Sequence, residues 1–103
     1  MPMILLTVPP DTTTLQCEWA DREIKAALRA EQVQGGITIW PVALATVPDR
    51  LLLEYKSRQE VADPNYLARV AAEAAEIVFG IQVEAAVIKL DPATTGLHIT
   101  PKR

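Results

Sequence analysis

Apolar residues follow two patterns along the chain, one typical of strands and one of helices. The first nine residues form a nearly continuous apolar run that Pro9-Pro10 closes. A short run with β-branched residues and a proline boundary is typical of a buried strand. We therefore expect a first strand that is covered on both faces and fixes the start of the chain inside the fold.

Two later stretches repeat apolar residues at intervals of three and four, which is the spacing of one helix face. The first follows Thr13, which forms a capping box with Gln16, and ends before Gly35-Gly36. The second begins at Asp63 as N-cap with Pro64 in its first turn, and Gly80 ends it. This helix is predicted to pack on a sheet through four apolar residues: Leu67, Val70, Ala74 and Ile77.

Three other segments have the composition of strands. Residues 37–40 alternate apolar with polar and are rich in β-formers. Because Pro41 has no N–H to donate, this strand belongs at a sheet edge or contains a bulge. Residues 51–55 form a third strand, apolar enough to be covered on both faces, and residues 83–90 form a fourth.

The order strand, helix, strand, strand, helix, strand makes two βαβ units. We expect an α+β fold, a four-stranded mixed sheet with two helices on one face, and a short extended tail at residues 97–100. Two arrangements fit this order. Either each unit pairs its own two strands in parallel, or the strands form a ferredoxin-like sandwich with antiparallel neighbours.

Length and composition limit the class of protein. The 103 residues, 50% of them hydrophobic and 22% charged, predict a single globular domain over residues 1–103. A net charge of −3 argues against nucleic-acid binding, which needs a basic face. We see no membrane span and no signal peptide, so the expected location is the cytoplasm. The chain has one cysteine, Cys17, and one histidine, His98. One cysteine cannot form an internal disulfide, and the two residues cannot form a zinc ligand cluster, so we expect no metal and no cofactor.

Pro2 is the residue near the start of the chain with distinctive chemistry. A methionine before a small second residue is usually removed, which would leave Pro2 with a free secondary amine. An α-amino group has a pKa of about 7.7 to 8.0, and burial disfavours its charged form. A general base works best when its pKa is near the working pH. Pro2 is therefore a candidate base, although Met-Pro is also an ordinary way to begin a strand.

The segment Pro2-Met3-Ile4-Leu5-Leu6-Thr7-Val8-Pro9 resembles the start of tautomerase superfamily proteins, especially the macrophage migration inhibitory factor and hydroxymuconate isomerase branches. The order and spacing of the elements from Leu51 to Thr100 also resemble the second unit of those proteins. The resemblance implies a tautomerase-like fold with parallel pairing in each unit, and a trimer. It also implies that a proline amine at position 2 moves a proton between carbon and oxygen of a keto or enol acid, while a cationic or amide donor stabilises the oxyanion.

The chain departs from this family where cations are expected. Asp11-Thr12-Thr13 stands where the hydroxymuconate branch has an arginine, and Gln34-Gly35-Gly36 stands where the inhibitory-factor branch has a lysine. An acidic substrate would need another cation, for which the candidates are Lys56, Arg50 and Arg29.

The leading hypothesis is a keto–enol isomerase of a small acid, with Pro2 as general base and Lys56 and Arg50 as candidate site residues. The alternative is a non-catalytic oligomeric or small-molecule-binding module on the same scaffold. In both cases we expect a symmetric homo-oligomer, most simply a trimer with its sheets facing inward. Residues 4–6 and 51–53 would otherwise leave a large apolar patch in water.

Overall fold

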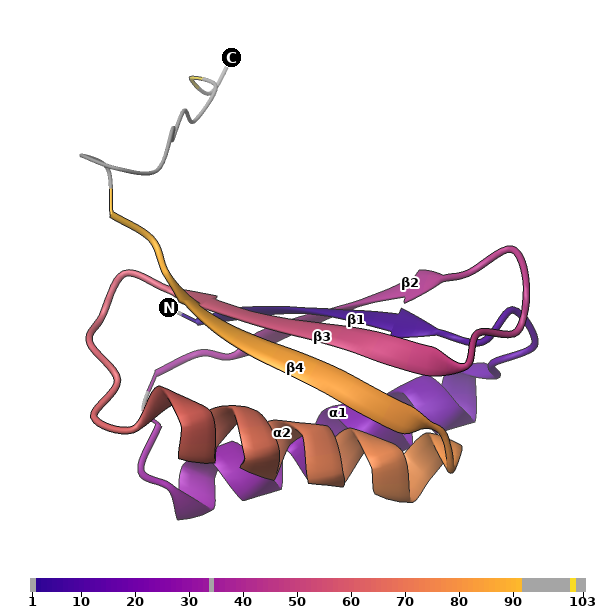
Figure 1. Ribbon diagram of the computed structural model, residues 1–103, viewed down its shortest axis with the longest axis horizontal. Helices are drawn as coiled ribbons and strands as arrows, with labels where there is room; N and C mark the ends of the chain where they lie inside the picture. The colour runs from indigo at the N-terminus through magenta and orange to yellow at the C-terminus, as the bar shows by residue number, and fades with distance from the viewer. Residues whose placement is uncertain (1, 34, 92–100, 102–103) are drawn as a thin grey trace.

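The computed structural model describes residues 2–33, 35–91 and 101 and contains a sheet with two helices on one side (Figure 1). The predicted α+β fold, two helices on one face of a four-stranded mixed sheet, is confirmed. The elements in chain order are β1 (Met3–Val8), α1 (Thr14–Ala30), β2 (Thr38–Ala43), β3 (Arg50–Ser57), α2 (Pro64–Phe79) and β4 (Gln82–Lys89). The predicted tail at residues 97–100, including His98, lies outside the described residues.

The strand order across the sheet is β2-β1-β3-β4. β1 runs parallel to β2 and β3 parallel to β4, while β1 and β3 pair antiparallel in the middle. Each βαβ unit therefore pairs its own two strands, and the ferredoxin-like alternative is wrong. Pro41 lies within the edge strand β2, where a missing N–H removes no bond from the interior of the sheet.

Three of the four helix ends form as their sequences predict, but α1 ends at Ala30 with Glu31 as its C-cap, before the predicted stop at Gly35-Gly36. Gln16 N–H donates to Thr13 Oγ1 at 3.2 Å, and Thr13 N–H donates to Gln16 Oε1 at 3.0 Å, which completes the capping box of α1. At the start of α2, Tyr66 N–H donates to Asp63 Oδ1 at 3.1 Å. Gly80 ends α2 with a φ of 65°, a left-handed conformation that glycine adopts without a steric cost.

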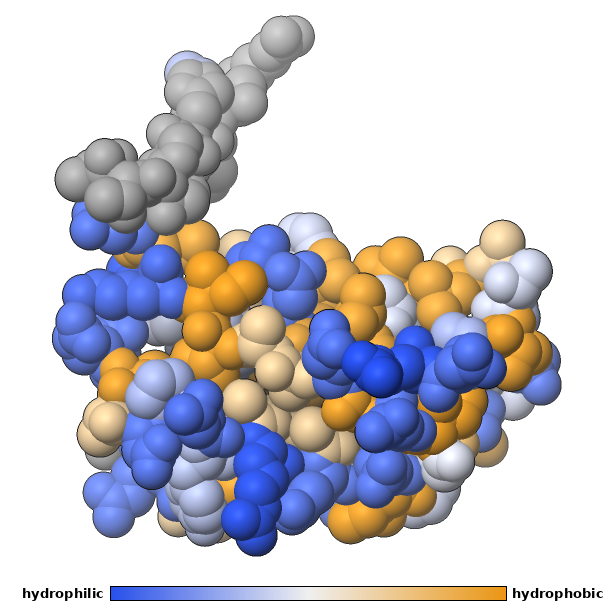
Figure 2. Space-filling model, viewed as in Figure 1, coloured by the Kyte–Doolittle hydropathy of each residue, from blue (hydrophilic) through white to orange (hydrophobic). Residues whose placement is uncertain are grey.

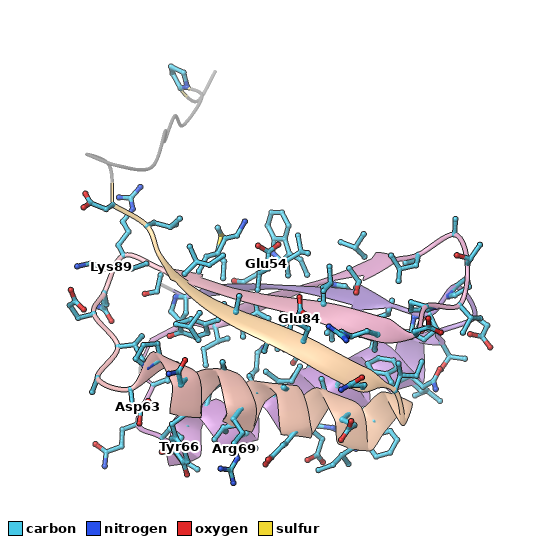
Figure 3. The ribbon with its side chains drawn as sticks, in the orientation of Figure 1. Glu54, Asp63, Tyr66, Arg69, Glu84 and Lys89 are labelled. Carbon is cyan, nitrogen blue, oxygen red and sulfur yellow. The ribbon has the colours of Figure 1, made fainter. Side chains whose placement is uncertain are left out.

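The core lies between the sheet and the helices. Its largest fully buried side chains are Ile4, Leu6, Ile24, Leu28, Leu51 and Leu53. The predicted packing of Leu67 and Ala74 is confirmed, and Arg69 points away from the sheet (Figure 3). The predicted burial of Ile77 is wrong, because this side chain is 64% exposed. Ile77 directly precedes buried Val78 and is turned about 100° from it around the helix axis, so it lies on the flank of the buried stripe.

The face of the sheet opposite the helices, called here the open face, carries exposed apolar side chains. Met3, Trp40, Val42 and Leu52 are each between 43% and 59% exposed. Apolar surface gathers over the sheet in the upper half of the space-filling view (Figure 2). In a single chain, the prediction that the first and third strands are covered on both faces is therefore wrong.

Within the part of the chain that the structure describes, neither helix has the length and apolar character needed to span a membrane.

Candidate functional site

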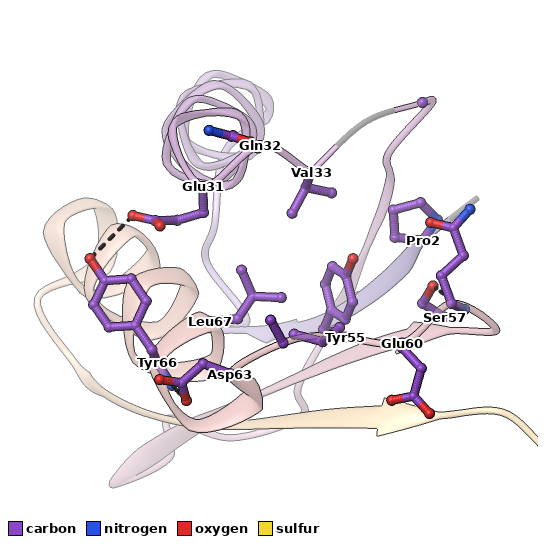
Figure 4. A pocket seen from close by; sticks show the side chains of 14 residues that line it. Pro2, Glu31, Gln32, Val33, Tyr55, Ser57, Glu60, Asp63, Tyr66 and Leu67 are labelled. Carbon is purple, nitrogen blue, oxygen red and sulfur yellow. Dashed lines mark hydrogen bonds between the residues drawn. The ribbon is translucent and has the colours of Figure 1, made fainter.

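A cavity of about 730 Å³ lies at the end of the sheet where β1 begins and β3 ends (Figure 4). Its walls come from the C-terminal end of α1, the end of β3, the loop before α2 and the first turn of α2. The lining residues that matter below are Pro2, Glu31, Val33, Tyr55, Ser57, Glu60, Asp63, Tyr66 and Leu67. Ligand sites in proteins commonly have a volume of about 300 to 1,000 Å³, so this cavity has room for a small molecule.

Pro2 is buried in the wall of this cavity. Its carbonyl oxygen accepts a hydrogen bond from Thr38 N–H at 3.3 Å, which fixes the start of β1 to the start of β2. On the other side of β1, Met3 lies opposite Lys56, and the same antiparallel register places Ser57 beside Pro2. Figure 4 shows Ser57 next to Pro2 at the cavity wall. The pairing of β1 with both neighbours thus positions Pro2.

Two buried hydroxyl groups accompany Pro2. Tyr55 and Ser57 are each only 4% exposed, and both side chains lie on the helix side of β3. The Tyr55 ring stands between Leu67 and Pro2, with its hydroxyl toward the space below Val33 (Figure 4). Burial raises the pKa of Tyr55, and a hydrogen bond with Ser57 opposes part of this rise. Tyr55 is therefore a neutral phenol at physiological pH and can donate a hydrogen bond into the cavity.

Sequence reasoning missed Tyr55 and Ser57 because it looked for charged oxyanion donors. The signal that could have found them is the alternation of side chains along β3. Once β1 and β3 pair antiparallel, positions 55 and 57 fall on the side of Ile4 and Pro2, whereas position 56 falls on the open face.

The structure does not bring Lys56 or Arg50 to Pro2 within one chain. Lys56 lies between Tyr55 and Ser57 on β3 and therefore points to the open face, opposite Met3. Arg50 begins β3, seven residues and about 23 Å of strand away from Ser57. Its Nη1 lies 2.6 Å from Glu84 Oε1. Arg29 does not line the cavity either.

Carboxylates supply the charges around the cavity. Glu31, Glu60 and Asp63 line it, and no lysine or arginine is among the lining residues in the described part of the chain. The Tyr66 hydroxyl donates to Glu31 Oε1 at 3.2 Å, and Glu60 pairs with Lys89 Nζ. The hydrogen bond from Tyr66 to Glu31, followed by the charge of that carboxylate, raises the pKa of Tyr66. The described residues contain no group of three His, Cys, Asp or Glu side chains that could hold a metal ion.

No protein-family model matches the chain, and neither does any curated protein. Several solved structures share its fold. Pt0534 inactivated by 2-oxo-3-pentynoate is 9% identical, with a TM-score of 0.68 over 92% of this chain and 91% of that one. Two structures of fused 4-OT are 8% and 10% identical, with TM-scores of 0.72 and 0.61. They cover 85% of this chain and 86% and 85% of their own, and the second is a symmetric trimer.

The macrophage migration inhibitory factor-like protein of Entamoeba histolytica is 16% identical, with a TM-score of 0.67 over 94% of this chain and 95% of its own. The chain therefore has the fold that the tautomerase superfamily proteins 4-OT and MIF share. This confirms the resemblance stated from the sequence. At these identities the likeness establishes the fold, and the chemistry has to be argued from the residues of the cavity.

Proposed function

We propose that the protein is a keto–enol isomerase in which Pro2, freed by removal of Met1, is the general base. The observation that supports this proposal is the position of Pro2, which is buried at the cavity wall beside the hydroxyls of Tyr55 and Ser57. An amine in this place would meet a bound carbonyl compound within a partly enclosed space. Burial would favour the neutral amine, which is the form that accepts a proton.

The reaction needs no partner beyond the substrate. The neutral Pro2 amine takes a proton from the carbon next to a carbonyl, the electrons of that C–H bond form a C=C bond, and the carbonyl oxygen becomes an enolate. The Tyr55 hydroxyl donates a hydrogen bond to this oxygen while its negative charge develops. The protonated amine then returns its proton to the oxygen and the enol leaves. Ketonisation of an enol follows the same steps in reverse.

The small acid that the sequence suggested as substrate would need a cation to bind it. Lys56 and Arg50 are the candidates, but both belong to β3 positions away from the cavity of their own chain. They could approach a bound acid only from a second copy. We propose that copies associate as a homotrimer through their open faces, as supported by the exposed Met3 and Leu52 and by the symmetric trimer formed by a fused 4-OT of the same fold.

A specific observation also favours the alternative function, a module that binds a small molecule without catalysis. None of the described residues that line the cavity is a lysine or arginine, so the developing oxyanion would have only neutral donors. In this reading Pro2 is a strand residue and the cavity is a binding pocket.

The rate at which the protein ketonises two enols distinguishes the isomerase from the binding module. The enol forms of phenylpyruvate and of its methyl ester are mixed with processed protein, and intact mass confirms that Met1 is absent. We expect turnover of at least one enol, and Pro2→Ala should reduce the rate by about 10²-fold or more. Protein that retains Met1 is the matched control, because its Pro2 nitrogen is an amide. Equal rates for all three forms, matched for folding and oligomeric state, would remove the isomerase and leave the binding module.

A further inference from the structure

We infer that the cavity takes an enolisable carbonyl compound that carries no carboxylate. This inference rests on the proposed function and concerns the substrate class of the same site. The charged side chains among the described residues that line the cavity are all carboxylates. Glu31, Glu60 and Asp63 all contribute to the lining, and Lys89 offsets only one of them, Glu60. Two negative charges are left beside the space that a substrate would fill.

The two helix ends at the cavity do not reverse this balance. The C-terminal end of α1 carries the negative end of its helix dipole, and Glu31 adds a carboxylate at the same place. The N-terminal end of α2 would favour an anion, because its free N–H groups carry partial positive charge. Asp63 already accepts one of these bonds from Tyr66 N–H, and Pro64 in the first turn has no N–H. Asp63 therefore already places a negative charge at the anion-attracting end of α2.

The cations nearest along the chain do not line the cavity. Lys56 lies between the lining residues Tyr55 and Ser57, but it points to the open face. The Arg29 guanidinium donates to the carbonyl oxygen of Gly35 at 3.4 Å, and Lys89 is engaged with Glu60. Arg58 is exposed and does not line the cavity, although its neighbours Ser57 and Gln59 do. A substrate carboxylate would thus lose its water without gaining a cationic partner from this chain, which is unfavourable.

A carbonyl compound without a carboxylate fits the remaining features. Val33 and Leu67 provide apolar wall for a hydrocarbon group, and the Tyr55 hydroxyl between them and Pro2 can donate to the carbonyl oxygen (Figure 4). An additional ammonium group on the substrate would be attracted by Glu31. The chain therefore selects by repelling acids as well as by accommodating neutral compounds.

The test compares kcat/KM for the two enols, the phenylpyruvate acid and its methyl ester, which differ only in the carboxylate. We expect the ester to be preferred by about tenfold or more, since like charges close together near a protein surface repel each other. Added salt should narrow this preference, because it screens the charges. Glu31→Gln, which keeps an acceptor for Tyr66, should raise the rate on the acid relative to the ester by about threefold.

Glu18→Gln is the matched control, because Glu18 is an exposed carboxylate near the other end of α1 and lies outside this cavity. It should leave the ratio between the two enols unchanged. A preference for the acid, or a ratio that responds neither to salt nor to Glu31→Gln, would overturn the inference and leave the isomerase proposal intact. Failure of both enols to show Pro2-dependent turnover would instead remove the isomerase proposal, and the inference with it.

Discussion

The Tyr66 hydroxyl donates a hydrogen bond to Glu31 Oε1 at 3.2 Å, and this contact joins the first turn of α2 to the residue that ends α1 (Figure 4). Both residues line the cavity, and the contact raises the pKa of Tyr66 above its ordinary value of 10.0. Because folding raises the pKa of the Tyr66 hydroxyl, the contact stabilises the folded state fully at pH values below the pKa that Tyr66 has in the unfolded chain. That contribution is lost as the pH rises through the folded pKa. The contact therefore holds throughout the neutral range.

The first prediction concerns this contact. The chain has two tyrosines, so Tyr55→Phe leaves Tyr66 as the only source of tyrosinate absorbance. In this background, the ultraviolet titration of Tyr66 should have a midpoint above that of the same chain unfolded in urea. Adding Glu31→Gln should lower the midpoint, because the carboxylate no longer opposes ionisation of the phenol. Identical midpoints with and without Glu31→Gln would show that the two side chains do not interact in solution.

The second prediction compares two apolar side chains of α2. Leu67 is 5% exposed and Ile77 is 64% exposed, although both belong to the same three-four pattern in the sequence. Leu67→Ala should lower the free energy of unfolding by about 2 to 5 kcal/mol, because it removes packed atoms and leaves a cavity. Ile77→Ala should change it by less than about 0.5 kcal/mol. Urea unfolding of both variants measures this difference, and equal losses would contradict the orientation of α2.

The contrast between Leu67 and Ile77 shows what the sequence could and could not predict. Local signals with a stereochemical cause were reliable, as Thr13, Asp63 and Gly80 illustrate, because capping depends on atoms a few residues away. The width of a buried helix stripe depends on the surface that it meets. Ile77 keeps the apolar spacing, but it lies on the flank of the buried stripe, where it is 64% exposed.

The candidate site shows the same limit on a larger scale. Pro2 could be chosen from the sequence, because the secondary amine that removal of Met1 would free follows from the identity of the second residue alone. The neighbours of Pro2 could not, because they follow from the antiparallel register of β1 with β3, which pairs residues about fifty positions apart. Lys56 was chosen for its charge, yet the register turns it to the open face and turns Tyr55 toward the cavity.

The third prediction concerns assembly through the open face. Leu52 is 46% exposed at the middle of this face, and Glu54 on the same strand stands on the same side of the sheet (Figure 3). Leu52→Arg should dissociate the proposed trimer into 11.3 kDa chains without changing the circular dichroism spectrum, because a long charged side chain is costly to bury at a packed interface but is solvated by water in the single chain. Ile77→Arg, on the exposed flank of α2, is the control and should remain a trimer. Sedimentation of the unmodified protein as an 11.3 kDa species alone would end the proposal.

The fourth prediction tests the role of Tyr55 as the donor to the developing oxyanion. Tyr55→Phe keeps the ring that packs against Leu67 and removes only the hydroxyl, so the fold should survive with a loss of about 1 kcal/mol or less from the hydrogen bond with Ser57. The kcat for ketonisation should fall by about 10²-fold while KM changes little, because the hydroxyl acts mainly where negative charge develops in the transition state. Steady-state kinetics on the preferred enol, with urea unfolding as the check on stability, measure both quantities. If Tyr55→Phe has the kcat of the unmodified protein, another group stabilises the oxyanion. If KM rises and kcat stays unchanged, Tyr55 serves substrate binding alone.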